Sequence, residues 1–187
     1  MPIQIGTKTH NFSDPTGLLS DCHRRIEMFL TSLEAVATVI DRPAEEEIRR
    51  ALESALRYFS EAATKHTADE EVSLFPRLRK VQDAEVQSTF SQLDKLVEEH
   101  RWAAGLHEEV ERVGRQYLVA NRLPTIEIEK FRNAVASLTF MYKRHIDIED
   151  SVVFPLAARL LPQLEKLAIA EEMTKRRDVK LVTSTDL

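Results

Sequence analysis

One short pattern, present twice, decides the fold of this chain. Residues 66–76 read HTADEEVSLFP, and residues 145–155, placed 79 positions later, read HIDIEDSVVFP. Each copy holds a histidine, a glutamate four residues later and a closing Phe-Pro pair. Residues four apart lie on the same side of an α-helix, about 6 Å apart along its axis. The histidine and the glutamate of each copy can therefore reach one common site.

The repeat extends upstream of both copies. His23-Arg24 is answered 77 residues later by His100-Arg101. The chain is therefore predicted to contain two helical hairpins of the same design, related by pseudo-two-fold symmetry. Each hairpin supplies one histidine from its first helix and a histidine plus a glutamate from its second.

Hydrophobic spacing between these motifs predicts four long helices. Asp14-Pro15 supplies an N-cap and a proline at the first helical position, and further starts are expected near residues 44, 83 and 125. Proline inside a helical pattern removes a hydrogen bond, so a break or kink is expected at Phe75-Pro76. The predicted fold is all-α, an up-down-up-down four-helix bundle over 14–175 with a short helix after Pro162. Residues 1–13 are expected to form an N-terminal arm and 176–187 a flexible tail.

Composition supports this class and excludes others. Only 4 Gly and 7 Pro occur in 187 residues, which favours long helices in a single domain. A net charge of -5 without a basic segment argues against nucleic-acid binding. The sequence shows neither a membrane-length apolar run nor a signal core, so a soluble, cytoplasmic protein is expected. Trp102 serves either core packing or a subunit interface, which leaves a homodimer open.

The histidines and glutamates of the repeat are predicted to face the bundle interior. An isolated H-x-x-x-E pair is more often solvated, and a lone histidine on an apolar face is more often a core residue. Here each histidine continues an apolar helical row. A buried carboxylate needs a partner, and neither Lys nor Arg stands on these rows near it. Because Cys22 is the sole cysteine, a metal site must use histidine and carboxylate. The candidate ligands are His23, His66, Glu70, His100, His145 and Glu149.

Six ligands of this kind suit two metal ions better than one. Each glutamate can bridge two ions about 3.5 to 4 Å apart while each ion takes two imidazoles. This arrangement leaves coordination positions open for a small ligand. The mixed donor set suits iron, manganese or zinc. Ferritin-like bundles are the main alternative, but they use E-x-x-H, which is absent from this sequence.

The repeated H-x-x-x-E-[E/D]-x-x-x-F-P, with a histidine on each partner helix, resembles the hemerythrin-like, or HHE cation-binding, domain over roughly residues 14–160. The resemblance implies two non-haem iron ions, with Glu70 and Glu149 bridging and the four histidines as terminal ligands. Oxygen-carrying hemerythrins have a further histidine four residues after the one on the third helix, where this chain has Ala104. The chain is closer to six-ligand variants, similar to bacterial iron-sulfur cluster repair proteins.

Four other residues lie near the motifs. His107 stands about 10 Å beyond His100 along the helix, and we expect it to line a channel or the core. Glu71 and Asp150 follow the ligand glutamates by one residue, so a solvated position is expected for both. Glu27 forms a third H-x-x-x-E with His23, and we expect it at the surface rather than as an alternate ligand.

Three functions are consistent with such a site. The first is reversible binding or sensing of a diatomic ligand, either oxygen or nitric oxide. The second is redox or iron-transfer chemistry on peroxide or nitric oxide, or in iron-sulfur cluster repair. The third is a structural role, in which the metal holds a helical interaction module together. Binding without turnover would indicate the first function, turnover or metal release the second, and unfolding on metal loss the third.

Overall fold

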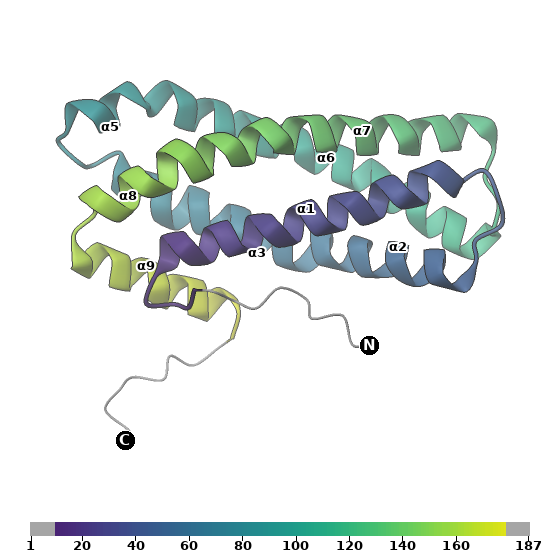
Figure 1. The fold of residues 1–187 in the computed structure, drawn as a ribbon, viewed down its shortest axis with the longest axis horizontal. Helices are drawn as coiled ribbons and strands as arrows, with labels where there is room; N and C mark the ends of the chain where they lie inside the picture. Colours follow the sequence, from purple (N-terminus) through teal and green to yellow (C-terminus); the bar gives the residue numbers. More distant parts are fainter. Residues whose placement is uncertain (1–9, 179–187) are drawn as a thin grey trace, which may run out of the picture.

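The computed structural model describes residues 10–178, and all its regular elements within that range are helices (Figure 1). Three of them, η1 to η3, are π-helical turns, in which a backbone N–H bonds to the fifth residue back instead of the fourth. In chain order the elements are α1 (Pro15–Val39), α2 (Glu46–Tyr58), η1 (Phe59–Ala63), α3 (Thr64–Ala68), η2 (Asp69–Leu74), α4 (Phe75–Leu78), α5 (Ala84–Ser88), α6 (Phe90–Ala120), α7 (Thr125–Ile148), η3 (Glu149–Val153), α8 (Phe154–Leu160) and α9 (Gln163–Arg176).

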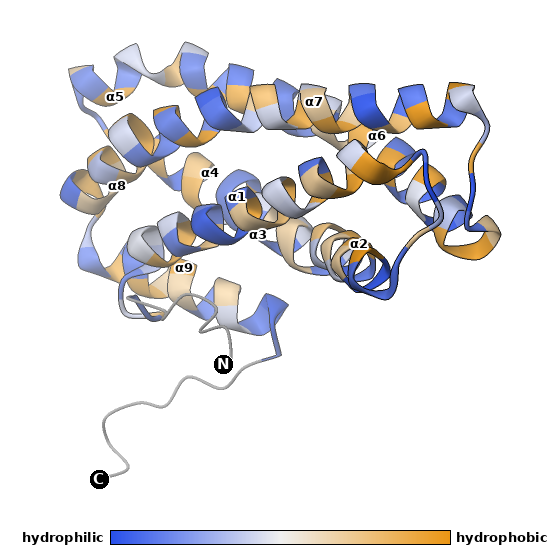
Figure 2. Cartoon of the chain, turned by 45° about the vertical axis from the view of Figure 1, so that its right-hand side comes forward, coloured by the Kyte–Doolittle hydropathy of each residue, from blue (hydrophilic) through white to orange (hydrophobic). Residues whose placement is uncertain are grey.

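These elements pack as a helical bundle, as the hydrophobic spacing predicted. Helix α1 packs against α2 and α7, and α6 packs against α7 and α2 (Figure 1). Orange and blue residues alternate along each long helix in Figure 2, the pattern of amphipathic helices. Within residues 10–178, none of the helices combines the length and the apolar character needed to cross a bilayer.

The predicted helix boundaries follow from capping side chains. Asp14 accepts a hydrogen bond from the backbone N–H of Gly17 at 3.0 Å and so caps α1. Asp83 accepts one from the backbone N–H of Glu85 at 2.8 Å and caps α5. Asn121 ends α6 in the left-handed conformation, with a φ of 57°.

Of the break or kink expected at Phe75-Pro76, the break does not occur, because the chain stays helical from Glu46 to Leu78. The π-helical turn η2 lies directly before Phe75-Pro76, and η3 lies in the same way before Phe154-Pro155. A proline ring crowds the carbonyl four residues earlier, and a wider π-helical turn relieves this clash. The helix therefore passes the proline without stopping.

Helix α9 follows Pro162, as expected, and is fastened to η2. The carboxylate of Asp69, which is fully buried, forms ion pairs with Arg176 at 2.6 Å and with Arg177 at 2.5 Å. The flexible tail was expected to begin at these two arginines, but both contact the bundle. Residues 179–187 of that predicted tail lie outside the described residues.

Two hydrophobic clusters fill the bundle. One lies among α1, α2, α6 and α7 and includes Leu33, Leu52 and Phe131. The other lies among α4, α6, α8 and α9 and includes Leu78, Leu93 and Ile169. The six histidines and glutamates of the repeat belong to neither cluster and form a separate buried polar group.

Candidate metal centre

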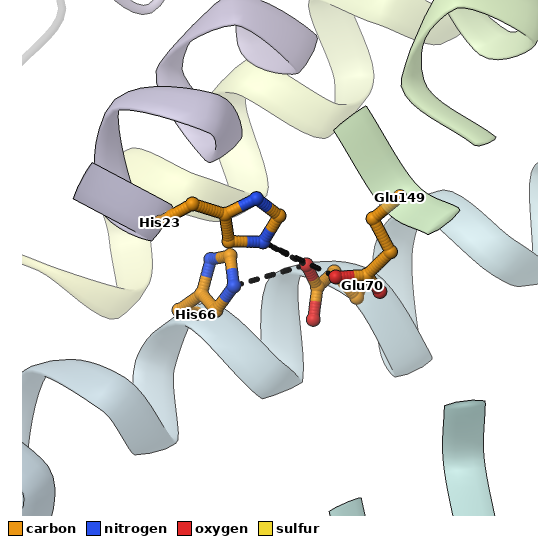
Figure 3. Close-up of side chains that lie close together, drawn as sticks. All are labelled: His23, His66, Glu70 and Glu149. Carbon is orange, nitrogen blue, oxygen red and sulfur yellow. Dashed lines mark ion pairs between the residues drawn. The ribbon is translucent and has the colours of Figure 1, made fainter. Parts of the chain in front are cut away.

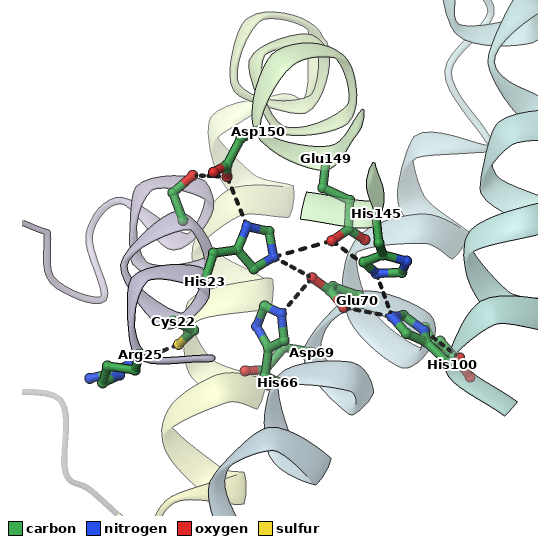
Figure 4. Close-up of polar contacts among 12 residues, drawn as sticks. Cys22, His23, Arg25, His66, Asp69, Glu70, His100, His145, Glu149 and Asp150 are labelled. Atoms are coloured by element: carbon green, nitrogen blue, oxygen red, sulfur yellow. Dashed lines mark hydrogen bonds and ion pairs between the residues drawn. The ribbon is translucent and has the colours of Figure 1, made fainter. Parts of the chain in front are cut away.

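The structure brings all six sequence-predicted residues together in the interior. His23 comes from α1, His66 from α3, His100 from α6 and His145 from α7, while Glu70 and Glu149 stand in the π-helical turns η2 and η3. All six are buried, and the most exposed of them, His100, keeps only 8% of its surface accessible. Figure 4 shows their polar atoms turned toward one another.

The six residues form two overlapping groups with metal-ligand spacing. His23, His66, Glu70 and Glu149 make the first group (Figure 3), and His100, His145 and Glu149 make the second. Within each group the candidate ligand atoms lie within 4.8 Å of one another. Each group contains two imidazoles, and Glu149 belongs to both groups.

Both glutamates stand between the two pairs of histidines, His23 with His66 and His100 with His145. Oε2 of Glu149 lies 3.1 Å from Nε2 of His23 and 3.2 Å from Nε2 of His145. Oε1 of Glu70 lies 3.0 Å from Nε2 of His66, and its Oε2 lies 3.4 Å from Nε2 of His100. Each carboxylate therefore faces one histidine of each pair.

Protons balance the charges of this site. Burial and the charge of Glu149 raise the pKa of Glu70 to about 8, so this carboxyl is neutral at pH 7. Burial opposes protonation of His145, but the charges of Glu149 and Glu70 raise its pKa to about 9. Burial likewise opposes the charge of His23, yet the hydrogen bond to Asp150 and the nearby carboxylate of Glu149 raise its pKa. A cation that binds here must displace these protons.

A metal cation fits the residues present. Nε2 of His23 and all four carboxylate oxygens of Glu70 and Glu149 are buried without an aligned hydrogen bond. Buried polar atoms are ordinarily satisfied, so a set of five around one point indicates a bound group. Imidazole nitrogen and carboxylate oxygen are the donors that iron, manganese and zinc accept.

Three further carboxylates contact the Nδ1 atoms of three of these imidazoles, on the side away from the centre of the site. Asp150 lies 2.9 Å from Nδ1 of His23, and Glu71 lies 2.8 Å from Nδ1 of His100. Their expected solvated position was wrong. Each of these residues points about 100° around its helix from the preceding glutamate. In that direction it faces the neighbouring helix, where its carboxylate accepts a hydrogen bond from a histidine of the other hairpin.

The sequence interpretation missed the third carboxylate, Glu99, which lies 3.0 Å from Nδ1 of His145. Its position directly before His100 was the signal that could have indicated it. Carboxylates on the far nitrogen fix the tautomer of a ligating imidazole and raise its basicity. Three of the four histidines are therefore oriented for a metal on Nε2.

Within the described part of the chain the remaining histidine, His66, has no such carboxylate, so the symmetry of the repeat is broken there. In the first hairpin the residue that corresponds to Glu99 is Cys22, directly before His23. The sulfur of Cys22 accepts a hydrogen bond from Arg25 at 2.9 Å. Nδ1 of His66 is buried without a hydrogen bond. His66 is thus the least firmly oriented of the four imidazoles.

Neutralising the supporting carboxylates is expected to weaken the site without removing a ligand. Glu71→Gln and Asp150→Asn should each lower metal affinity roughly 10- to 100-fold, because the paired imidazole loses its acceptor. Competition with a chromophoric chelator measures this affinity. Glu27→Gln is the control, since Glu27 is exposed and pairs only with Arg24 among the described residues. Equal affinity in all three variants would contradict this role.

Two other sequence-predicted residues are placed as follows. His107 lies outside both ligand groups and lines a cavity, where Nε2 lies 3.1 Å from the hydroxyl of Tyr142. Burial lowers the pKa of His107 to about 4, so the ring is neutral at pH 7. Glu27 is at the surface, as expected.

A helical bundle whose interior gathers four histidines and two glutamates at metal-ligand spacing defines a cation-binding helical protein. The sequence model of the hemerythrin HHE cation binding domain matches residues 14–157, so the chain belongs to this family. Members of the family bind metal cations, typically iron. The chain is also similar to an uncharacterized protein of Haemophilus influenzae, with 26% identity over 185 residues and 96% of each chain covered.

Proposed function

We propose that this chain is a cytoplasmic di-iron protein that binds or senses a diatomic ligand, oxygen or nitric oxide. One ion would be held by His23 and His66 and the other by His100 and His145, with Glu70 and Glu149 shared between them. The proposal takes the long helices in up-down-up-down order, which their short connections support. The observation that carries it is the overlap of the two ligand groups at Glu149.

The two ion positions differ in a way that favours ligand binding at one of them. The first group has four protein ligands, whereas the second has three with Glu70 slightly farther away. His100, which belongs to the second group, also lines a cavity of about 410 Å³ between α2–α3 and α6. A small molecule can therefore approach the position that has fewer protein ligands.

The chain positions donors and excludes water around this approach. A reduced iron pair, when bound, supplies the electrons and the open coordination that a diatomic ligand needs. Burial raises the pKa of Tyr142, so its hydroxyl stays protonated and bonded to His107 in the cavity wall. Buried apolar side chains such as Ala103 and Val110 line part of the approach and limit the water there.

Metal analysis and spectra test the proposal. Protein purified without added metal should contain about two irons per chain, the number that paired sites hold. Its iron charge-transfer absorption should disappear on anaerobic reduction and change again when oxygen or nitric oxide is added, without turnover. One zinc, or no metal in a folded bundle, would overturn the iron assignment. Two irons that leave both gases unbound would overturn the ligand assignment alone.

The unpartnered Nδ1 of His66 favours a second function, redox or iron-transfer chemistry. A ligand whose Nδ1 lacks an acceptor holds its metal less firmly, which suits a protein that releases iron. This alternative predicts that one of two irons passes to a chelator much faster than the other, or that peroxide or nitric oxide is consumed. Equal release of both irons and no turnover would leave the binding function.

A further inference from the structure

The cavity beside His100 is too large for a diatomic ligand alone. Its volume of about 410 Å³ falls in the range of sites that bind organic molecules, roughly 300 to 1,000 Å³. A single water occupies only about 30 Å³ of liquid volume. Of the six candidate ligands only His100 lines it, and the other lining residues come from α2, η1, α3, α6 and α7.

The wall of this cavity is largely apolar. Leu56, Phe59, Ala63, Ala103 and Val110 line it, and all five are buried. Ala104, one helical turn after His100, also lines it and leaves the approach wide because its side chain is a single methyl group. A longer side chain at position 104 would occupy this space.

The wall also carries polar residues, among them Ser60, Thr64 and Thr67, and two of its polar side chains, His107 and Tyr142, are bonded to each other. The ring of His107 stacks on Phe59 at 4.4 Å and is bonded through Nε2 to the hydroxyl of Tyr142. Its Nδ1 has no hydrogen-bond partner among residues 10–178 and is not among the fully buried polar atoms. A few convergent polar groups in an apolar wall are typical of small-molecule sites.

The charges at the cavity favour a neutral occupant. The acidic residues that line it are Glu108, which is exposed, and Glu111, which pairs with Arg115 at 2.7 Å. Neither Lys nor Arg lines it, so an anion would find no counter-charge there. A buried ion without a partner is strongly disfavoured.

We propose that this cavity binds a small, neutral aromatic molecule with one hydroxyl group, which packs against Phe59 and hydrogen-bonds to the His107–Tyr142 pair. Such a phenol-type ligand lies against His100 and governs access to the metal centre. Its binding needs the cavity and not iron. The proposal therefore stands apart from the proposed diatomic function, and either can fail without the other.

Equilibrium dialysis with 2-naphthol and with naphthalene, which lacks the hydroxyl, tests the site. We expect 2-naphthol to bind once per chain and about 3- to 10-fold more tightly than naphthalene, the difference that one hydrogen bond makes. Protein as purified and zinc-loaded protein should give the same result. The absence of saturable binding at the solubility limit would overturn the proposal.

Variants assign the binding to this cavity. Ala104→Phe should weaken binding of both probes at least tenfold, whereas Ala136→Phe, at an exposed position of α7, should leave it unchanged. His107→Phe keeps the stacking ring but removes the hydrogen bond, so 2-naphthol should lose its advantage over naphthalene. Circular dichroism checks that each variant is folded. Unchanged binding in Ala104→Phe, or an unchanged probe ratio in His107→Phe, would place the site elsewhere.

Discussion

Replacing Glu149 with glutamine is expected to remove most of the bound metal, from about two ions per chain to fewer than one, the loss expected when a bridging ligand is removed. Glu149 belongs to both ligand groups, and one of its oxygens lies about equally far from His23 and His145. Glutamine keeps the shape of the side chain but cannot carry the negative charge that bridges two cations. Plasma emission spectroscopy on protein purified without added metal measures the loss.

Matched variants separate this effect from general damage. Glu70→Gln should lose metal as well, because Glu70 faces His66 and His100 with different oxygens. Glu98→Gln changes the same residue type at an exposed position of α6 and should keep the full metal content. Metal loss in Glu98→Gln equal to that in Glu149→Gln would refute the ligand assignment.

The gathering of these six residues was predictable because the sequence states the pattern twice. Hydrophobic spacing places His66 and His145 on apolar rows, and the repeat gives the two hairpins the same geometry. The structure indeed gathers the four histidines and two glutamates at one place. Hydrophobic periodicity and an internal repeat are both visible in the sequence itself, so they could be recognised without a structure.

Two of the contacts that the sequence interpretation missed run between the hairpins. Asp150 bonds to His23 and Glu71 bonds to His100, each across a helix seam. A helical wheel gives the angle of a residue from the bundle axis but not which neighbour lies in that direction. An acidic residue that does not point at the bundle interior was therefore expected to be solvated.

The π-helical turns at Glu70 and Glu149 were missed for a different reason. The rule that proline interrupts a helix assumes α-helical hydrogen bonding before it. Here the chain widens its turn directly before Phe75-Pro76 and Phe154-Pro155, and the ligand glutamates stand in these turns. Such turns are frequent at functional sites, so the repeated Phe-Pro after each H-x-x-x-E was itself a signal of them.

Removing the metal is expected to lower the melting temperature by at least about 10 °C, since a ligand bound only by the folded state stabilises it by several kcal/mol. The bundle should stay folded at room temperature, because two hydrophobic clusters, neither of which includes the candidate ligands, fill its interior. Circular dichroism melts of loaded and chelator-treated protein measure the difference. Unfolding at room temperature on metal loss would instead support the structural role.

The stability gap between loaded and metal-free protein should widen from pH 7 to pH 9. In the folded metal-free protein the pKa of Glu70 is raised from 4.5 to about 8 and that of His145 from 6.5 to about 9. The folded chain therefore holds protons that the unfolded chain has already lost, so its stability falls as pH rises through this window. Bound cations have displaced these protons, and the loaded protein is spared. The gap should grow on the order of 5 °C.

Glu70→Gln provides the decisive comparison for this pH effect. Glutamine is neutral at every pH, so the metal-free variant should lose part of the decline in melting temperature between pH 7 and pH 9. Metal-free Glu98→Gln should keep the full decline, because its exposed side chain is not part of the site. A gap that stays constant or narrows with rising pH would show that protons and metal do not compete for these residues. A decline that persists fully in Glu70→Gln would assign it to His145 and His23 instead.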